Sequence, residues 1–143
     1  PVGEHFELGL RGRAQTSFGQ VLANAEQFGI ATLDGISPLM TGTLQGDAGY
    51  VVRGEARAPF TVATDGLFAR LAPYAFAAQG MVRLEQPTVF EQRTTEAFAY
   101  GGGLRLAGRM DGSPGLSASI EYGRVHLEGL RPDRVSFTLL TRF

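Results

Sequence analysis

The sequence predicts an all-β fold, an antiparallel meander of about six long strands. The first indication is strict alternation, as in "GDAGYVVRGEAR" at 46–57, where Tyr50 and Val52 fall on one face and Arg53 and Glu55 on the other. The second is the set of turn-forming clusters between such segments: "TDG" at 64–66, "MDGSPG" at 110–115 and "RPD" at 131–133. The third is the near absence of helical periodicity.

The first three expected strands differ in how clearly they are oriented. The segment at 6–16 places Leu8 on one face and Arg11 on the other. The second strand is the alternating segment just quoted, extended to Ala58. The third, at 71–82, is apolar on both faces, so alternation does not say which face it buries.

The last three expected strands, at 97–106, 116–123 and 134–143, each carry large apolar side chains on one face and small or charged ones on the other. The apolar faces hold Phe98, Tyr100, Leu104, Leu106, Leu116, Ile120, Tyr122, Val135, Phe137 and Leu139. These alternating patterns are typical of strands that face two different environments.

A long connection with little regular pattern occupies residues 18–45, within which 20–29 ("QVLANAEQFG") favours a helical turn or two. Loops of this length inside a compact domain are uncommon and usually functional. A chain of 143 residues has room for one domain with a sizeable core, so we interpret 1–143 as a single unit.

Composition and spacing exclude several classes of function. The net charge of -1 offers no basic surface for nucleic acid, and the absence of cysteine excludes thiolate chemistry. His5 and His126, the only histidines, lie near opposite ends of the chain. Asp47 and Glu55 stand about 26 Å apart along a strand, too far for paired-carboxylate chemistry. We therefore expect no enzyme activity, no catalytic or metal-binding residues and no cofactor.

Two observations bear on which face of the sheet meets water. Several segments reach the length that a tilted membrane-spanning strand requires. Their polar faces combine Arg with Gly, Ser and Ala, and none of the basic residues is Lys. A wide polar lumen inside an apolar outer band would give this composition. The pattern favours a transmembrane outer-membrane β-barrel, while periodicity alone leaves a soluble barrel or sandwich open.

The chain ends on an alternating apolar series that includes Phe137, Leu139 and Phe143. This series resembles the C-terminal signal by which bacterial outer-membrane barrels are recognised for insertion. That signal commonly has an aromatic residue two positions before the end, where this chain has Thr141.

A more specific resemblance runs in order over essentially the whole chain. "LRGRAQTS" at 10–17, "NAEQFG" at 24–29, "GDAGYVVRGEAR" at 46–57, "LAPYAFAAQG" at 71–80 and "YGGGLRL" at 100–106 resemble successive segments of the two-partner secretion transporters, the haemolysin-activator family. The matching motif positions are Glu26, Gln27, Phe28, Gly46, Asp47, Gly49, Arg53 and Glu55. Each motif is weak alone, and their order carries the resemblance.

The resemblance implies the C-terminal segment of a larger outer-membrane β-barrel that exports a partner protein. Its expected partners are a secreted exoprotein, outer-membrane lipid and the barrel-assembly machinery, and its expected location is the bacterial outer membrane. Two alternatives stay open: a barrel-assembly insertase of the same superfamily, and a soluble β-barrel binding module.

The chain departs from the family in the long loop. Counting back from "GDAGY", the loop tetrad of the family falls on Leu33, Asp34, Gly35 and Ile36, where the family has Arg in the second place and an aromatic residue in the fourth. The family's loop Arg is thought to reach an Asp on the inner wall, and that position is Ala78 here. Because both partners are replaced together, we expect this loop to be held in the lumen differently or not at all.

Six arginines could form a cationic series along one polar face: Arg11, Arg13, Arg53, Arg57, Arg105 and Arg142. Such a series would suit a sliding chain. The alternative is a set of structural ion pairs with Glu7, Glu55 and Glu121.

Overall fold

The computed structural model describes residues 6–23, 25–40, 43–64, 67–110, 115–127 and 133–142. For residues 67, 109, 110 and 140–142 it describes the backbone only. Every regular element in the described residues is a strand. No helix in this part of the chain is long and apolar enough to cross a membrane. The segment 20–29, for which a helical turn was expected, contains turns and a short strand instead.

One antiparallel sheet dominates the fold, in the order β1-β4-β6-β7-β8-β9, with β5 pairing beside β6. Its strands are β1 (Glu7–Gln15), β4 (Ala48–Arg57), β5 (Phe60–Thr64), β6 (Leu67–Arg83), β7 (Thr94–Met110), β8 (Gly115–His126) and β9 (Asp133–Arg142). A small second sheet pairs β2 (Phe28–Gly29) with β3 (Gln45–Gly46). The predicted antiparallel meander is confirmed. The sheet is open, with β1 and β9 at its ends.

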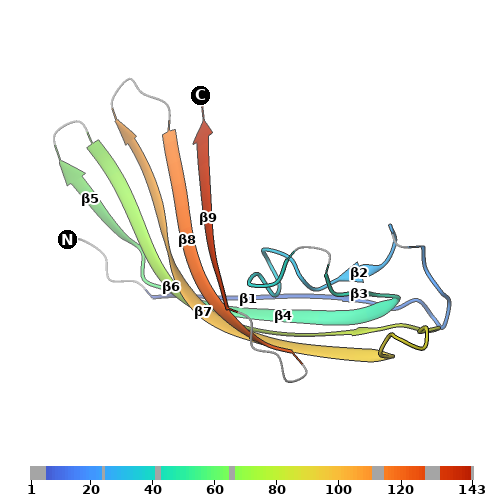
Figure 1. The fold of residues 1–143 in the computed structure, drawn as a ribbon. Coiled ribbons are helices and arrows are strands. Elements are labelled where there is room, and N and C mark those ends of the chain that lie inside the picture. Colours follow the sequence, from blue (N-terminus) through green and yellow to red (C-terminus); the bar gives the residue numbers. More distant parts are fainter. Residues whose placement is uncertain are drawn as a thin grey trace.

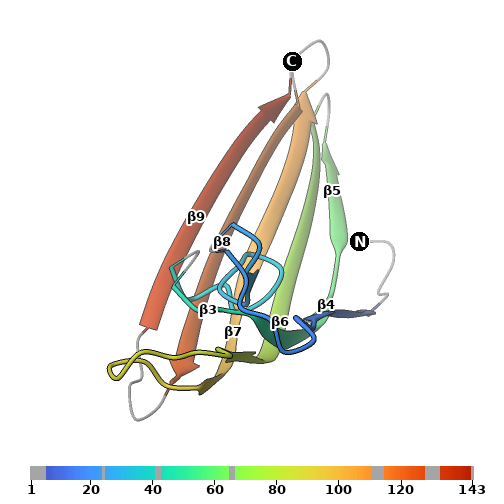
Figure 2. The ribbon, with the colours of Figure 1, turned by 90° about the vertical axis from the view of Figure 1, so that its right-hand side faces the viewer.

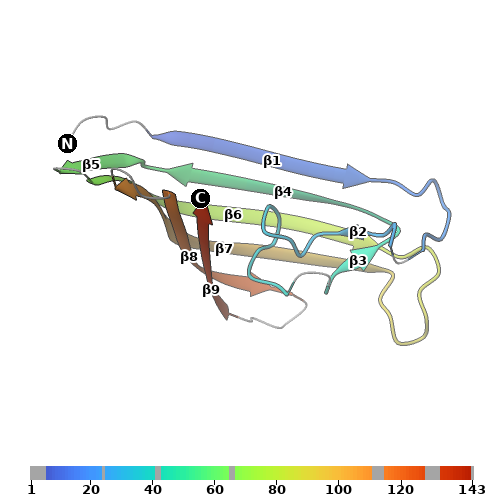
Figure 3. The ribbon, with the colours of Figure 1, turned by 90° about the horizontal axis from the view of Figure 1, so that it is seen from above.

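The sheet is strongly bent. Figure 1 shows a flat arm, formed by β1, β4 and the neighbouring parts of β6 and β7, and an upright arm that contains β5, β8, β9 and the rest of β6 and β7. The segment between β1 and β4, which includes β2 and β3, lies inside the bend, as the views in Figures 2 and 3 also show. We call the side of the sheet that faces this segment the inner face and the other side the outer face.

A proline accounts for the break between β4 and β5. The Pro73 carbonyl accepts a hydrogen bond from the Ala58 N–H at 3.0 Å, and Pro73 has no N–H to return. Pro59 follows directly and also lacks a donor. Because a ladder needs donors at these places, pairing with β6 stops at Arg57 and resumes at Phe60. The sequence predicted β4 as a segment ending at residue 58, and it did not predict β5.

The glycines of β7 allow aromatic rings of β6 to lie across the strand. A Cβ on Gly103 would meet the Tyr74 ring at 2.6 Å, and a Cβ on Gly101 would meet the Phe76 ring at 2.9 Å. Any larger residue would displace the rings or the backbone of β8. Gly101 and Gly103 of the "GGG" in β7 are therefore required by close packing.

Strand register assigns each residue to a face. Arg53 lies opposite Arg11 on one side and Ala78 on the other, and Ala78 lies opposite Ala99. Directly paired residues in an antiparallel sheet share a face. The inner face therefore carries Arg11, Arg53 and Arg105, and the outer face carries the aromatic and aliphatic series of β7, β8 and β9. Register also orients β6, with Tyr74, Phe76, Ala78 and Val82 on the inner face.

The buried core lies on the inner face beneath the loop. It combines side chains of the loop with side chains of the sheet: Phe28, Ile30, Ile36, Val51, Tyr74, Phe76, Ala78, Val82, Ala97, Ala99 and Val125. The sequence predicted a wide polar lumen. Where the loop covers the inner face and excludes water, that face also carries an apolar core.

Candidate functional site

The long loop is anchored to the sheet by its middle part. Ile36 is completely buried, and its N–H donates to the Ile30 carbonyl at 2.9 Å, which closes a compact turn. Gly35 lies between them, and a Cβ there would meet the Ile30 carbonyl oxygen at 2.6 Å. The loop therefore rests on the sheet through backbone and apolar contacts that leave no room for a larger residue at position 35.

Arg53 on β4 makes the main polar contact between the sheet and the long loop. Its side chain is only 4% exposed. One guanidinium nitrogen donates to the Ser37 hydroxyl at 2.7 Å and to the Gly35 carbonyl at 3.3 Å. The group lies 3.8 Å above the centre of the Phe76 ring, a cation–π contact. A single wall arginine thus holds both a backbone and a side-chain group of the loop.

Glu121 on β8 neutralises Arg53 and completes the contact with the loop. Its Oε2 accepts from Arg53 at 2.9 Å and from the Tyr74 hydroxyl at 2.7 Å. Its Oε1 accepts from the Ser37 hydroxyl, which donates to Glu121 while accepting from Arg53. Both carboxylate oxygens and the hydroxyl are therefore satisfied, as buried polar groups must be.

A second ion pair continues this cluster along the inner face. Arg105 on β7 makes two hydrogen bonds to Glu55 on β4, at 2.5 and 2.9 Å, and lies 4.1 Å above the Tyr74 ring. Glu55 is also 3.5 Å from Arg53. We call the six residues of this connected set the polar network: Ser37, Arg53, Glu55, Tyr74, Arg105 and Glu121.

The polar network is electrically balanced, with two guanidinium groups and two carboxylates. Each charged group has an opposite charge within hydrogen-bonding distance. Such saturation fixes the geometry of the cluster. The arrangement is suited to holding the loop against the wall. Three of the predicted structural ion pairs are confirmed: Glu7 with Arg57, Glu55 with Arg105, and Glu121 with Arg53.

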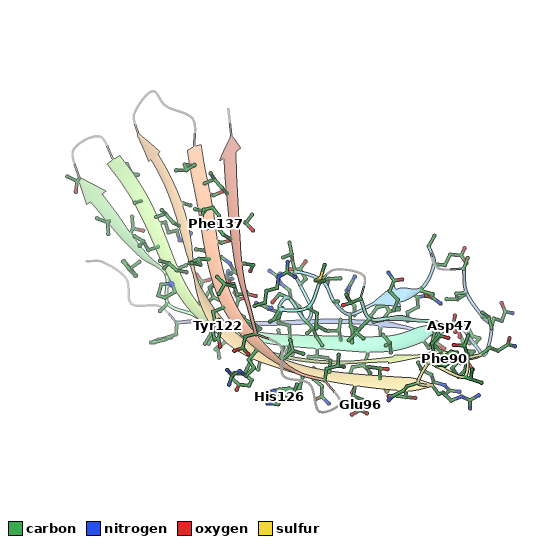
Figure 4. All side chains as sticks on the ribbon, in the orientation of Figure 1. Asp47, Phe90, Glu96, Tyr122, His126 and Phe137 are labelled. Carbon is green, nitrogen blue, oxygen red and sulfur yellow. The ribbon has the colours of Figure 1, made fainter. Side chains whose placement is uncertain are left out.

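Asp47 ties together two loops at the far end of the flat arm. Although it is almost completely buried, it accepts from the Leu22 N–H at 2.7 Å and from the Glu85 N–H at 2.8 Å. The Glu85 hydrogen bond is the largest reason that the pKa of Asp47 is lowered, followed by the Leu22 bond, while burial opposes the shift and the Gln27 side chain adds to it. Figure 4 shows Asp47 and Phe90, in the β6–β7 loop, at this end.

The loop tetrad is placed differently from what its family counterpart would require. Asp34 is exposed and pairs with Arg11 on β1. Leu33 is exposed, whereas Gly35 and Ile36 are buried. Ala78, at the position of the family's wall Asp, is buried in the core directly opposite Arg53. In this chain the buried arginine that contacts the loop, Arg53, comes from the sheet, and the loop supplies a carbonyl and a hydroxyl to it.

The remaining motif positions surround the base of the loop. The Glu26 carbonyl accepts from the Gln15 side chain at 2.8 Å. Phe28 is buried, with the Arg13 guanidinium 5.4 Å from its ring centre. Gly46 lies in β3 and Gly49 in β4. The structure thus gathers these positions at one side of the flat arm, apart from the polar network.

The C-terminal series and the histidines lie elsewhere. Phe137 and Leu139 project from the outer face of β9 and are exposed. His126 also lies on the outer face, stacked on Tyr100 with ring centres 5.8 Å apart; Figure 4 shows it on the side of the flat arm away from the loop. His5 and Phe143 lie outside the described residues. Within that part of the chain, no group of three potential metal ligands occurs together.

The sequence indicated Arg53, Glu55, Arg105 and Glu121 as polar-face residues but not how they are connected. It did not indicate Ser37 or Tyr74 as part of the polar network. Tyr74 lies in a segment that is apolar on both faces, and Ser37 lies in the irregular loop. Only the strand register and the path of the loop bring these two hydroxyls to Glu121.

No protein-family model, curated protein or solved structure matches this chain.

Proposed function

We propose that the chain is the C-terminal part of a two-partner secretion transporter, a β-barrel of the bacterial outer membrane that exports a large partner protein as an unfolded chain. The transport needs no bond-making chemistry. Weak, reversible hydrogen bonds from the polar inner face guide the extended chain, and folding of the partner outside makes export directional. Support comes from the ordered sequence resemblance and from the distribution of side chains over the two faces.

The observation that carries the proposal is the inverted polarity of the sheet. On the outer face Phe98 is 44% exposed, Tyr122 46% and Phe137 67%, whereas Arg53 on the inner face is 4% exposed. Large contiguous apolar surfaces of this kind are rare on soluble monomers and mark contact with lipid or protein. An apolar exterior around a polar interior is the arrangement of outer-membrane barrels.

The apolar surface also has a height that suits a membrane. On β7 it runs from Leu106 to Phe98, about 26 Å along the strand and about 20 Å across a membrane at the usual tilt, against about 25 Å for outer-membrane barrels. Beyond it comes the outward-facing Glu96. On β8, Arg124 lies opposite Tyr100, near the same end of this surface, and forms an ion pair at 2.7 Å with Asp133. Aromatic residues followed by charges are expected where lipid gives way to water.

The connections are asymmetric, as in outer-membrane barrels. Two residues separate β5 from β6 and four separate β7 from β8, whereas ten separate β6 from β7 and a long loop separates β1 from β4. Short turns face the periplasm and long loops the exterior in this class of protein. The loop end of the flat arm would then be extracellular.

Membrane insertion is tested with one outer-face and one inner-face substitution in the same strand. Phe137→Arg is expected to weaken insertion into phospholipid vesicles by about 3 kcal/mol, because a charge would enter the lipid, and Ser136→Arg by much less. Folding into vesicles is followed by protection from protease. Equal effects of the two substitutions, or a protein that is monodisperse in buffer without detergent, would favour the soluble module instead.

Export is tested in the bacterium that makes the protein. Deleting the protein should remove one large secreted protein from the medium, and restoring it, or its Ser136→Arg variant, should return that protein. Phe137→Arg should not. An unchanged set of secreted proteins together with depleted outer-membrane barrels would contradict the transporter and favour the insertase.

A further inference from the structure

The upright arm carries a groove on its inner face that the loop does not cover. One part of it, of about 510 Å³, is lined by Glu7, Arg57, Pro59, Arg70, Ala72, Arg105, Leu106, Ala107, Ser117, Ala118, Ser119 and Thr138. A second part continues past Arg70, Ala107 and Ser117 to Thr61 and Phe68. The floor consists of small residues on β7 and β8, and the longer side chains of β1, β4 and β6 stand beside it.

The charges in this groove do not balance. Glu7 is the carboxylate nearest to two arginines: it lies 2.7 Å from Arg57 Nε and 3.6 Å from the Arg70 guanidinium, a distance too long for a hydrogen bond. Arg105 is already occupied by both oxygens of Glu55. Among the described side chains of the groove, the cationic charge therefore exceeds the anionic charge, and the surplus lies at Arg70.

The position of Arg70 suits a ligand. Its side chain is largely exposed, so its guanidinium can turn toward a group in the groove. Phe68, two residues away on the same face of β6, is also exposed. Ser119 and Thr138, which carry hydroxyl groups, also line the groove. In such a groove the planar guanidinium can bind a carboxylate, and the aromatic ring can contact an adjacent side chain. The hydroxyls can hydrogen-bond to a peptide backbone.

We propose that this groove is a subsite for acidic segments of an extended polypeptide, with Arg70 pairing with Glu or Asp side chains and Phe68 contacting neighbouring ones. This inference rests on the proposed function for the identity of its ligand, a chain in transit. The site binds weakly, because an exposed ion pair in water contributes little and the chain must move on. It adds a preference for negative charge beside the balanced polar network.

Binding is measured by fluorescence anisotropy with the detergent-solubilised protein and three labelled peptides of equal length, one Glu-rich, one Gln-rich and one Arg-rich. We expect the Glu-rich peptide to bind about tenfold more tightly than the Gln-rich one, a preference that falls with added salt. Arg70→Gln should abolish this preference, and Arg70→Lys should retain part of it. Arg93→Gln, which removes the same charge from the exposed β6–β7 loop, should leave it unchanged.

Inorganic phosphate serves as the free anion in competition. Phosphate should displace the Glu-rich peptide no better than chloride at equal ionic strength, and Phe68→Ala should weaken peptide binding. Strong competition by phosphate, together with no effect of Phe68→Ala, would mean that the groove binds a free anion and not a polypeptide. Equal binding of all three peptides, or unchanged binding by Arg70→Gln, would overturn the site. The assay contains no membrane and no exported partner, so its outcome is independent of the insertion and export experiments.

Discussion

The inner face of the sheet consists of two unlike halves. The covered half, beneath the loop, buries Arg53 and Glu121 together with the apolar core around Ile36. The open half, on the upright arm, presents Arg70 and Ser119 in a groove. Both halves include residues of β4, β6, β7 and β8, and both carry arginine, glutamate and small side chains.

The difference between the halves shows that coverage by the loop, more than the position in the sheet, determines whether an arginine is fully paired. Where the loop excludes water, an arginine must be fully paired, and Arg53 has three acceptors in reach. Where no loop covers the wall, Arg70 can share a distant carboxylate, because water satisfies the rest. The covered half therefore serves to fix structure, and the open half is free to contact a moving ligand.

The largest expected effect comes from breaking the polar network in the covered half. Glu121→Ala leaves the Arg53 guanidinium buried without its main counter-charge, which should lower the free energy of unfolding by about 4 kcal/mol. Urea unfolding in detergent, followed by circular dichroism, measures this. Glu96→Ala, which removes an exposed outer-face carboxylate, is the control and should change stability by less than about 0.5 kcal/mol. A similar loss in both variants would show that the pairing of Arg53 is unimportant.

The next effect tests whether apolar contact holds the loop. Ile36→Ala should cost about 3 kcal/mol, because it leaves a cavity between loop and sheet. Leu33→Ala, three residues earlier in the exposed part of the tetrad, should cost almost nothing. If limited proteolysis cuts the loop equally fast in both variants, the burial of Ile36 does not hold it in place.

Asp47 provides a pH-dependent test at the base of the loop. Asp47→Asn should cost about 2 kcal/mol at neutral pH, since hydrogen bonds to a charged carboxylate are replaced by weaker ones. The pKa of Asp47 is lowered from its usual value, so its contribution is complete above pH 4 and is lost as the pH falls through the lower pKa of the folded state. Unfolding curves of both proteins from pH 7 to pH 2 should converge at the acidic end. A constant gap would contradict the role of the ionised carboxylate.

A smaller effect compares this loop contact with the ion pair expected from the family that the sequence resembles. Asp34→Arg and Ala78→Asp, made singly and together, form a double-mutant cycle. Because Arg53 lies directly opposite Ala78, a new Asp there should pair with Arg53, and the coupling with position 34 should be below about 0.5 kcal/mol. A coupling well above this, measured by urea unfolding, would mean that the family's ion pair can still form in this chain.

The smallest expected effect on stability is in the open half. Arg70→Gln should change the free energy of unfolding by less than about 0.5 kcal/mol, because its ion pair with Glu7 is long and exposed. The same urea titration measures it beside Glu121→Ala. A loss of several kcal/mol would show that the open half is as structural as the covered half.

Much of the fold could be predicted because alternation is local. The patterns around Val52, Phe98, Tyr122 and Phe137 gave the strands and separated their faces, and the turn clusters gave the meander. The predicted strands at 71–82 and 97–106 already included Pro73 and the glycines of β7, but both were too short, since β6 and β7 extend beyond them at both ends. Proline is tolerated there because the neighbouring strand is itself interrupted, a fact invisible along one segment.

The sequence by itself determined the alternation of the strands, their order as a meander and the separation of arginines from aromatic residues, because side-chain direction in a strand follows from residue number alone. Only the tertiary structure decided that the loop lies on the inner face, that Ser37 and Tyr74 join Glu121, and that Arg70 stays in the open. These depend on register between strands and on the path of an irregular segment, and both are set by packing among residues far apart in the chain.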